Sequence, residues 1–445
     1  MHFSVIARWV LLPAVLLAGV LIAVLFCINL PWFDEELHPD LVRLASPKSF
    51  LMEGNALPWM YGIHAADDQD PLELGQEIVL AILNRARRNE TRALTLREMY
   101  EDRGMIYDEA WKQDLSESRC EEGSDCLGSR RTEEVAQLVG STPRLRLLLE
   151  RYDSLIRSSR YQDLSDAEPT SFAGPAPDQI VFLDLAGARL AFAYRNAGTE
   201  EFLAGVASEF SFWRLVLDDA DSIIGKMVAL TVISADIEYL SALVRNRKPN
   251  SADLQTISRI LTPFSQEERN LGEMFRVEML GLYSLWDIES GRTLPRRLSW
   301  FALQKNATAN ELYTQLILPM TLRASLSAED WCEQEAYQPI EYRVRAFPPP
   351  LFNLSGKSFI RKFAAGWKDI LRTTGHVHDV AGRMSLVSLQ AEIARNPEGD
   401  VATIIRSSTH RDPYTQEPML YNAGAGTIGF ECRSFDSGDR SISIR

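Results

Sequence analysis

Two histidines and an aspartate form the most metal-like string in this chain, namely His376, His378 and Asp379. On a strand, alternating residues point to the same side, so the two imidazoles together with the carboxylate could bind a zinc ion. The chain contains 6 histidines, so a third protein ligand would have to come from His64, His410 or a carboxylate. The string also falls between two predicted helices. We therefore favour a helix-capping surface turn and predict no metal site.

A second group of charged residues combines an acidic cluster with a lysine. Asp218, Asp219 and Asp221 lie close together, and on a helix Asp218 and Asp221 would share a face that suits Mg²⁺ or Ca²⁺. We favour a solvated acidic face or a helix start. Lys226 follows in an apolar stretch, where a desolvated amine with a lowered pKa could act as a base or nucleophile. We favour a structural lysine paired with a carboxylate.

The remaining motifs give weaker indications of a cofactor, a modification or a catalytic site. The string from Gly424 to Gly429 matches G-x-G-x-x-G, but this pattern binds dinucleotides only between a strand and a helix, so we favour a glycine-rich turn and predict no cofactor. Asn306-Ala307-Thr308 matches a glycosylation sequon, to which we give little weight. The sequence contains no G-x-S-x-G, H-E-x-x-H or P-loop motif. With 61 acidic residues, paired carboxylates can always be imagined, so the catalytic residues stay unknown.

An apolar segment near the N-terminus is the strongest pattern in the sequence. From Trp9 to Ile28, about 20 residues carry no charge, enough at about 1.5 Å per helical residue to cross a hydrocarbon layer of roughly 30 Å. Arg8 precedes the segment and an acidic run beginning at Asp34 follows it. Because Lys and Arg favour the cytoplasmic side, we expect residues 1–8 in the cytoplasm, a transmembrane anchor at 9–28 and the body outside.

A cleaved signal peptide is the main alternative to an uncleaved signal anchor. Its apolar region would span about 7–15 residues and end in small residues, whereas this stretch is longer and ends with bulky Phe26 before Cys27. A lipoprotein signal fits poorly for the same reason. A later apolar stretch, Ile223 to Val244, contains three charged residues, which a lipid-facing helix would accommodate only at several kcal/mol. We therefore predict a buried helix of the body there.

The remaining cysteines are Cys120, Cys126, Cys332 and Cys432. An even number of cysteines in a segment assigned to the outside indicates disulfide bonds. Four cysteines permit three pairings, and the short loop between Cys120 and Cys126 favours that pair, which leaves Cys332 with Cys432. A zinc site is the competing interpretation, but the spacing is not C-x-x-C and no histidine lies close to Cys120 or Cys126.

The rest of the chain predicts a mostly α fold. Residues 29–70 are expected to form a linker and docking segment, and residues 71–445 a helical body with a subdomain boundary near 165–180, where proline and glycine cluster. Alternating apolar residues around Ile428 and Phe430 predict a small C-terminal β-hairpin. The net charge of −14 argues against nucleic acid as a partner, because that binding depends on Lys and Arg.

Four strings spread over most of the chain carry a family resemblance. They are Glu150-Arg151-Tyr152, Lys226-Met227-Val228-Ala229-Leu230, Asn306-Ala307-Thr308-Ala309-Asn310 and the tail from Asp412 to Pro418. The chain in this respect resembles a family of uncharacterised exported proteins of Gram-negative bacteria. The resemblance implies a single-pass protein of the bacterial inner membrane with its body in the periplasm, and it implies no activity. The tail is also similar to the C-terminal hairpin of major pseudopilins. Because the pilin processing site is lacking, we interpret the tail as a similar hairpin and do not assign the chain to the pseudopilins.

These patterns predict a membrane-anchored envelope protein that acts without catalysis, as a scaffold or binding module for an envelope partner. The alternative is an anchored periplasmic hydrolase acting on cell-wall or glycan material. A deep cleft lined by two acids roughly 5–10 Å apart would favour the hydrolase. An exposed apolar patch of several hundred square ångströms would favour the scaffold.

Overall fold

The computed structural model describes residues 2–46, 49–88, 130–167, 177, 179–289, 303–333, 352–432 and 440–444. The fold is mostly helical, as predicted, with a small antiparallel sheet at the C-terminal end. The helices are α1 (His2–Ile28), α2 (Pro39–Leu44), α3 (Ala56–Gly62), α4 (Pro71–Arg87), α7 (Arg130–Ser141), α8 (Pro143–Leu155), α9 (Leu164–Ala167), α10 (Gln179–Asn196), α11 (Thr199–Asp219), α12 (Ile223–Arg247), α13 (Ser251–Ile260), α14 (Gln266–Arg269), α15 (Gly272–Glu289), α17 (Lys305–Leu312), α18 (Leu318–Ala324), α19 (Ala328–Glu333), α20 (Leu354–Thr374), α21 (His376–Arg395) and α22 (Val401–Ser407).

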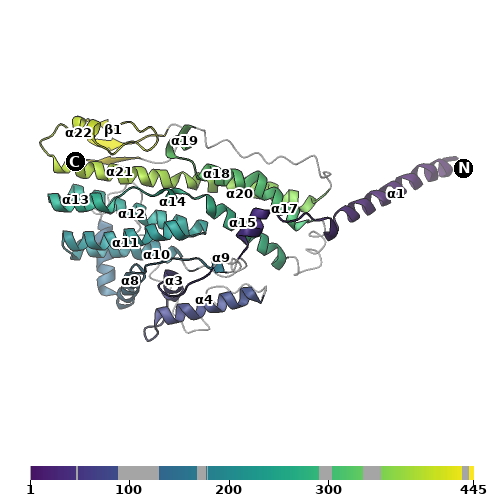
Figure 1. Ribbon diagram of the computed structural model, residues 1–445, viewed down its shortest axis with the longest axis horizontal. Helices are drawn as coiled ribbons and strands as arrows, with labels where there is room; N and C mark the ends of the chain where they lie inside the picture. The colour runs from purple at the N-terminus through teal and green to yellow at the C-terminus, as the bar shows by residue number, and fades with distance from the viewer. Residues whose placement is uncertain are drawn as a thin grey trace.

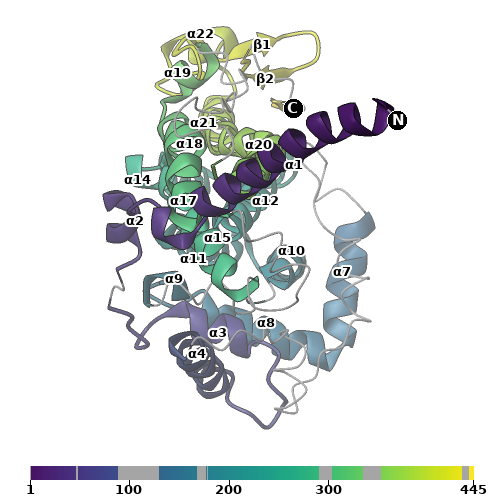
Figure 2. The same ribbon diagram turned by 90° about the vertical axis from the view of Figure 1, so that its right-hand side faces the viewer.

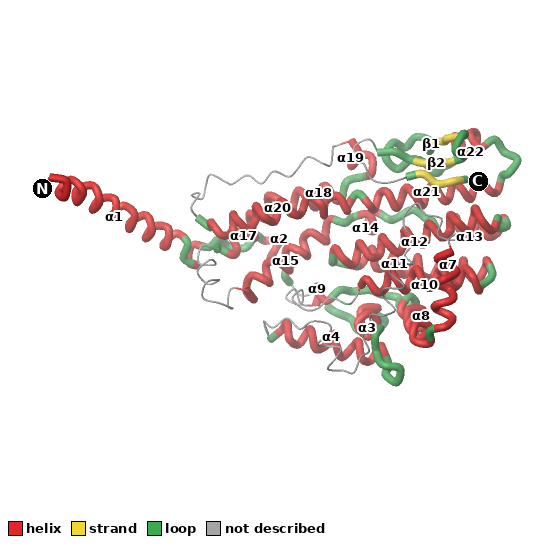
Figure 3. Tube along the Cα trace, turned by 180° about the vertical axis from the view of Figure 1, so that it is seen from behind, coloured by secondary structure: helices red, strands yellow, loops and turns green. Residues whose placement is uncertain are grey.

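The two ends of the described chain lie at opposite ends of the molecule. Helix α1 projects away from the body, whereas the sheet and α22 lie at the far end (Figure 1). The same arrangement is seen from behind in Figure 3. Viewed toward α1, the helices α3, α4 and α8 form the side of the body away from α21 and the sheet (Figure 2).

Helix α12 forms the centre of the body, with α10, α11 and α21 packed against it. Among the residues whose side chains are described, which include only Pro13–Val24, Cys27 and Ile28 of α1, it is also the one helix of 18 or more residues that is apolar enough to cross a membrane. However, 72% of its apolar window is buried inside the protein. A helix that is apolar on every face is stable in water only when other helices cover all its sides. The sequence-based prediction of a buried helix here agrees with this packing.

Helices α3 and α4 cross at two glycines. A Cβ added at Gly62 would collide with the carbonyl of Pro71, and a Cβ added at Gly75 would collide with the carbonyl of Pro58. Because glycine has no side chain, the two backbones can approach each other this closely. The two glycines thus allow the close packing of α3 against α4.

The C-terminal sheet contains the predicted hairpin and one further strand. Strands β1 (Leu420–Asn422) and β2 (Thr427–Gly429) pair antiparallel, with Tyr421 opposite Ile428. Strand β3 (Ser441–Ser443) adds to the other edge of β2, with Ile442 opposite Ile428. The side chain of Ile428 is fully buried against the helices. The subdomain boundary near 165–180 stays a prediction, and residues 168–176 lie outside the described part of the chain.

Candidate functional site

Helix α1 carries a long exposed apolar surface. All residues from Pro13 to Val24 are exposed, and the side chains of Leu17 and Leu21 are 71% and 53% exposed. Two aromatic residues continue this surface past the helix, with Trp32 and Phe33 exposed by 87% and 59%. A contiguous apolar surface of this kind is unfavourable in water and marks a contact with a membrane or another apolar partner.

The chain that follows α1 is tied to the first turn of α17, and we call this contact the anchor junction. The two carboxylate oxygens of Asp34 accept hydrogen bonds from the backbone N–H groups of Asn306 and Ala307, each at 2.9 Å. These N–H groups lie in the first turn of α17, where no carbonyl of the same helix can accept them. Asp34 therefore caps a helix about 270 residues further along the chain, and its charge suits the positive end of that helix.

Further contacts hold the anchor junction from several directions. The side chain of Asn310 donates to the carbonyl of Glu36 at 2.8 Å and accepts from the backbone N–H of His38 at 2.8 Å. On the other side, the Asn29 side chain accepts from the backbone N–H of Asn353 at 2.9 Å. Contacts to two separate segments thus hold the chain at the base of α1 against the body. The predicted linker is in this part a docked segment.

The glycosylation sequon lies inside the anchor junction. The Asn306 amide donates to the carbonyl of Glu35 at 2.8 Å and accepts from the hydroxyl of Tyr283 at 2.7 Å. Thr308 is fully buried, and its hydroxyl bonds to the side chain of Asn353. These side chains therefore position the base of α1 and are not presented for modification.

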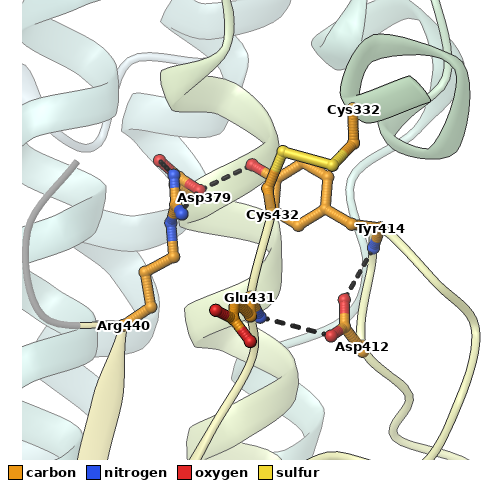
Figure 4. The surroundings of a disulfide bond; sticks show 7 residues. All are labelled: Cys332, Asp379, Asp412, Tyr414, Glu431, Cys432 and Arg440. Atoms are coloured by element: carbon orange, nitrogen blue, oxygen red, sulfur yellow. Dashed lines mark hydrogen bonds and ion pairs between the residues drawn. A yellow bond between two sulfur atoms is a disulfide. The ribbon is translucent and has the colours of Figure 1, made fainter. Parts of the chain in front are cut away.

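The metal-like string forms the first turn of α21, with His376 half-buried and His378 and Asp379 buried, so our prediction of a surface turn was wrong. His378 is only 2% exposed, and burial lowers its pKa to about 4. Asp379 receives two hydrogen bonds from the guanidinium of Arg440, at 2.9 and 3.2 Å, and one from the hydroxyl of Tyr414 at 2.6 Å (Figure 4). Within the described ranges, no three histidine, cysteine or acidic side chains gather as metal ligands. The carboxylate thus fastens the C-terminal tail to α21.

A disulfide ties the same tail to α19. Cys332 and Cys432 are joined with their Cα atoms 5.8 Å apart, which closes a loop of sequence separation 100 (Figure 4). Next to it, Asp412 accepts hydrogen bonds from the backbone N–H groups of Tyr414 and Glu431, at 2.8 and 3.3 Å. The favoured pair of Cys120 and Cys126 lies outside the described residues.

Lys226 lies in the first turn of α12, and its side chain reaches the end of α11, where it has a structural role. Its ammonium group is buried and donates to the carbonyls of Leu217 and Asp218, at 2.7 and 3.4 Å. Burial lowers the pKa of Lys226, while the charges of Asp221 and Asp218 oppose that shift. These hydrogen bonds go to backbone carbonyls, not to the carboxylate that we expected. A cation at this position suits the negative end of a helix.

The acidic cluster lies at the end of α11 and directly before the N-cap residue of α12, Ser222. Asp218 and Asp219 are the last two residues of that helix, and Asp221 lies beyond it. Asp218 and Asp221 therefore do not share a helical face. Asp218 and Asp219 are exposed to solvent, in agreement with a solvated acidic surface.

A buried polar cluster that the sequence did not reveal lies between α8, α10, α11 and α12. Glu209 is fully buried and accepts hydrogen bonds from the hydroxyl of Tyr152 at 2.8 Å and from Arg189 at 2.6 Å. Asp236 is also fully buried, and neither of its carboxyl oxygens has a hydrogen-bond partner in the described structure. Burial, followed by the charge of Glu209, raises the pKa of Asp236 well above its usual range. The signal in the sequence was an aspartate at a core position of an apolar helix.

The polar cluster does not resemble the site of a carboxylate-dependent hydrolase. Such an enzyme needs both acids in contact with substrate and water. Glu209 and Asp236 are closed off from solvent, and Glu209 is held by Arg189 and Tyr152. We interpret this cluster as part of the core.

No family model matches the chain, and searches of curated proteins and of solved structures find no similar protein.

Proposed function

We propose that this chain is a single-pass membrane protein without catalytic activity, which holds its helical body in a fixed orientation at the membrane surface as a scaffold or binding module. The observation that carries the proposal is the exposed apolar surface of α1, joined without a free linker to the capped start of α17. A bilayer would cover the side chains from Pro13 to Val24. Trp32 and Phe33 would then lie at the interface, where aromatic side chains are favoured.

Two features support a body outside the cytoplasm. Arg8 precedes the apolar segment and acidic residues follow it, which favours a cytoplasmic N-terminus. The disulfide between Cys332 and Cys432 is of the kind that persists in oxidising compartments. With the resemblance to exported proteins of Gram-negative bacteria, the proposed location is the inner membrane with the body in the periplasm.

A scaffold accounts for the rigid anchor junction better than a tethered enzyme does. A flexible linker would let an enzyme reach substrate at many distances, whereas contacts to Asn310 and Asn353 keep the body at one height and angle. A binding surface on the body would thereby meet an envelope partner at a constant distance from the membrane. We propose such a partner as the ligand of the body.

Reporter fusions after residue 60 test the direction of the anchor. An alkaline-phosphatase fusion should be active and a cytoplasmic reporter fusion inactive. Alkaline extraction of membranes tests the anchor itself, and the full chain should stay in the membrane pellet. An active cytoplasmic reporter, or full release into the soluble fraction, would overturn the proposal.

A pair of matched variants assigns membrane retention to α1. Leu21 on α1 and Leu80 on α4 are exposed by 53% and 51%, so a change to arginine has a similar effect on solvation in water. Leu17→Arg combined with Leu21→Arg places two charges in the proposed span, at about 2.5–3.5 kcal/mol each, and should shift most of the protein to the soluble fraction. Leu80→Arg should leave it in the pellet. Equal retention of both would show that α1 is not the anchor.

A further inference from the structure

A cavity of about 280 Å³ lies between α10, α12 and α21. It is lined by Leu183, Ala186, Gly187, Thr231, Val232, Ser234, Ala235, Glu238, His376 and Arg383. The lining includes none of the four residues of the buried polar cluster, Tyr152, Arg189, Glu209 and Asp236. A volume of this size is close to the lower end of the range for small-molecule sites.

The lining combines an ion pair and a histidine with mostly small and aliphatic side chains. Arg383 donates to Glu238 at 3.1 Å, and this pair is almost buried between α12 and α21. His376 lies two turns before Arg383 on α21, which places it about 10 Å along that helix. Most of the other lining side chains are small or aliphatic, including Ala186 and Ala235. The ion pair balances its own charge, so the lining favours an uncharged molecule.

Gly187 keeps the cavity open from the side of α10. A glycine in the interior of a helix costs about 0.5–1 kcal/mol relative to alanine. At Gly62, this cost is offset because the missing side chain lets two backbones pack closely. At Gly187, by contrast, an added Cβ would meet no described atom within 4 Å. The packing seen in the structure gives no reason for a glycine here. The absence of a side chain at Gly187 instead leaves part of the cavity empty.

Ser234 contributes an unsatisfied hydroxyl to the lining. It is 9% exposed, and its side-chain oxygen is buried without a hydrogen-bond partner in the described structure. A serine inside a helix usually bonds to a carbonyl one turn earlier, yet Ser234 does not. Leaving a buried hydroxyl unpaired costs about 1–3 kcal/mol, and a bound hydrogen-bonding group would remove this cost.

We propose that this cavity binds an uncharged, largely aliphatic small molecule that presents one hydroxyl or amide group to Ser234. Scaling from the roughly 150 Å³ cavity that accepts benzene, the volume holds about ten non-hydrogen atoms. The inference goes beyond the proposed function and does not depend on the membrane anchor, because all of the lining residues belong to the body.

Binding of three ring compounds of the same shape tests the proposal. Cyclohexanol, cyclohexylamine and cyclohexanecarboxylate differ mainly in charge at neutral pH. Saturation-transfer NMR on the full chain in lipid nanodiscs should detect cyclohexanol, with the two charged compounds at least about tenfold weaker. Because the alcohol also enters lipid, the specific signal is the difference between the natural protein and a variant with a filled cavity in the same nanodiscs.

Gly187→Leu fills the cavity and should weaken cyclohexanol binding at least about tenfold. Gly140→Leu is the matched control, since Gly140 is also a helical glycine with no described atom near an added Cβ but is exposed on α7. It should bind like the natural protein. Ala235→Leu fills the cavity from the opposite wall and replaces Gly187→Leu if that variant does not fold.

Ser234→Ala isolates the hydrogen bond and should weaken cyclohexanol binding by about three- to tenfold. Three outcomes would overturn the proposal: no binding by the natural protein, equal binding by a folded variant with a filled cavity, or tighter binding of a charged compound.

Discussion

Replacing Asp236 with asparagine should stabilise the folded body, and the gain should grow as pH rises. Both carboxyl oxygens of Asp236 are buried without a hydrogen-bond partner among the described residues. The nearby cation, Arg189, forms an ion pair with Glu209. Burial raises the pKa of Asp236 well above its usual range, with the charge of Glu209 adding to this. In the folded state, Asp236 therefore keeps its proton to a higher pH than in the unfolded chain.

The magnitude follows from proton linkage. Above the pKa of about 3.9 in the unfolded chain, the folded state binds one proton more than the unfolded state, so the free energy of unfolding falls by about 1.4 kcal/mol per pH unit. The fall continues until the folded pKa is reached. Across the roughly three units up to pH 7, Asp236 costs at most about 4 kcal/mol. Asparagine has the same shape and stays neutral, so it removes this pH-dependent cost.

Thermal unfolding of the full chain in nanodiscs between pH 4.5 and 8 measures the effect. The midpoint of Asp236→Asn should exceed that of the natural protein by several degrees at neutral pH and by much less at pH 4.5. Asp68→Asn makes the same chemical change at an exposed position of the body and should follow the natural protein. A constant difference between Asp236→Asn and the natural protein at all pH values would refute the reasoning, because Asp236 would then not titrate on unfolding.

Three further predictions concern the junction, the disulfide and the buried histidine. Asp34→Ala should destabilise the start of α17 by about 1–2 kcal/mol and speed hydrogen exchange at the amide of Asn306, whereas Glu36→Ala, which removes an exposed side chain, should not. Replacing Cys332 and Cys432 with serine should cost about 2–5 kcal/mol, and reductant should lower the thermal midpoint of the natural protein by more than that of the variant; equal shifts in the two proteins would count against it. Because the pKa of His378 is lowered from 6.5 to about 4, stability should fall as pH drops through this range, and His378→Gln should remove that loss in a pH series; an unchanged acid profile would contradict it.

The sequence predicted the features that depend on neighbours along the chain. Helical periodicity indicated a mostly α body, and the alternation around Ile428 predicted the hairpin, because these patterns arise from local backbone geometry. The apolar character of Ile223 to Val244, interrupted by charges, predicted a buried helix. Pairing of Cys332 with Cys432, favoured by elimination, is the pairing that the structure contains.

The same reasoning was wrong where the environment of a side chain decided its role. His378 and Asp379 were expected in a helix-capping surface turn, because sequence spacing says nothing of the Arg440 and Tyr414 side chains that contact Asp379. Lys226 was expected to pair with a carboxylate, but its nearest acceptors are carbonyls at the end of α11. In both cases the partner comes from another segment.

By itself, then, the sequence determined the helices, the apolar N-terminal segment and the small sheet, since each depends on residues within a few positions of one another. Only the tertiary structure decided that Asp34 caps α17, that Asp236 lies beside Glu209, and that Gly187 and Ser234 border one cavity. These relations join segments tens to hundreds of residues apart. Chain folding creates them, because a carboxylate or a hydroxyl acquires its partner, its charge state and its space from whatever packs against it.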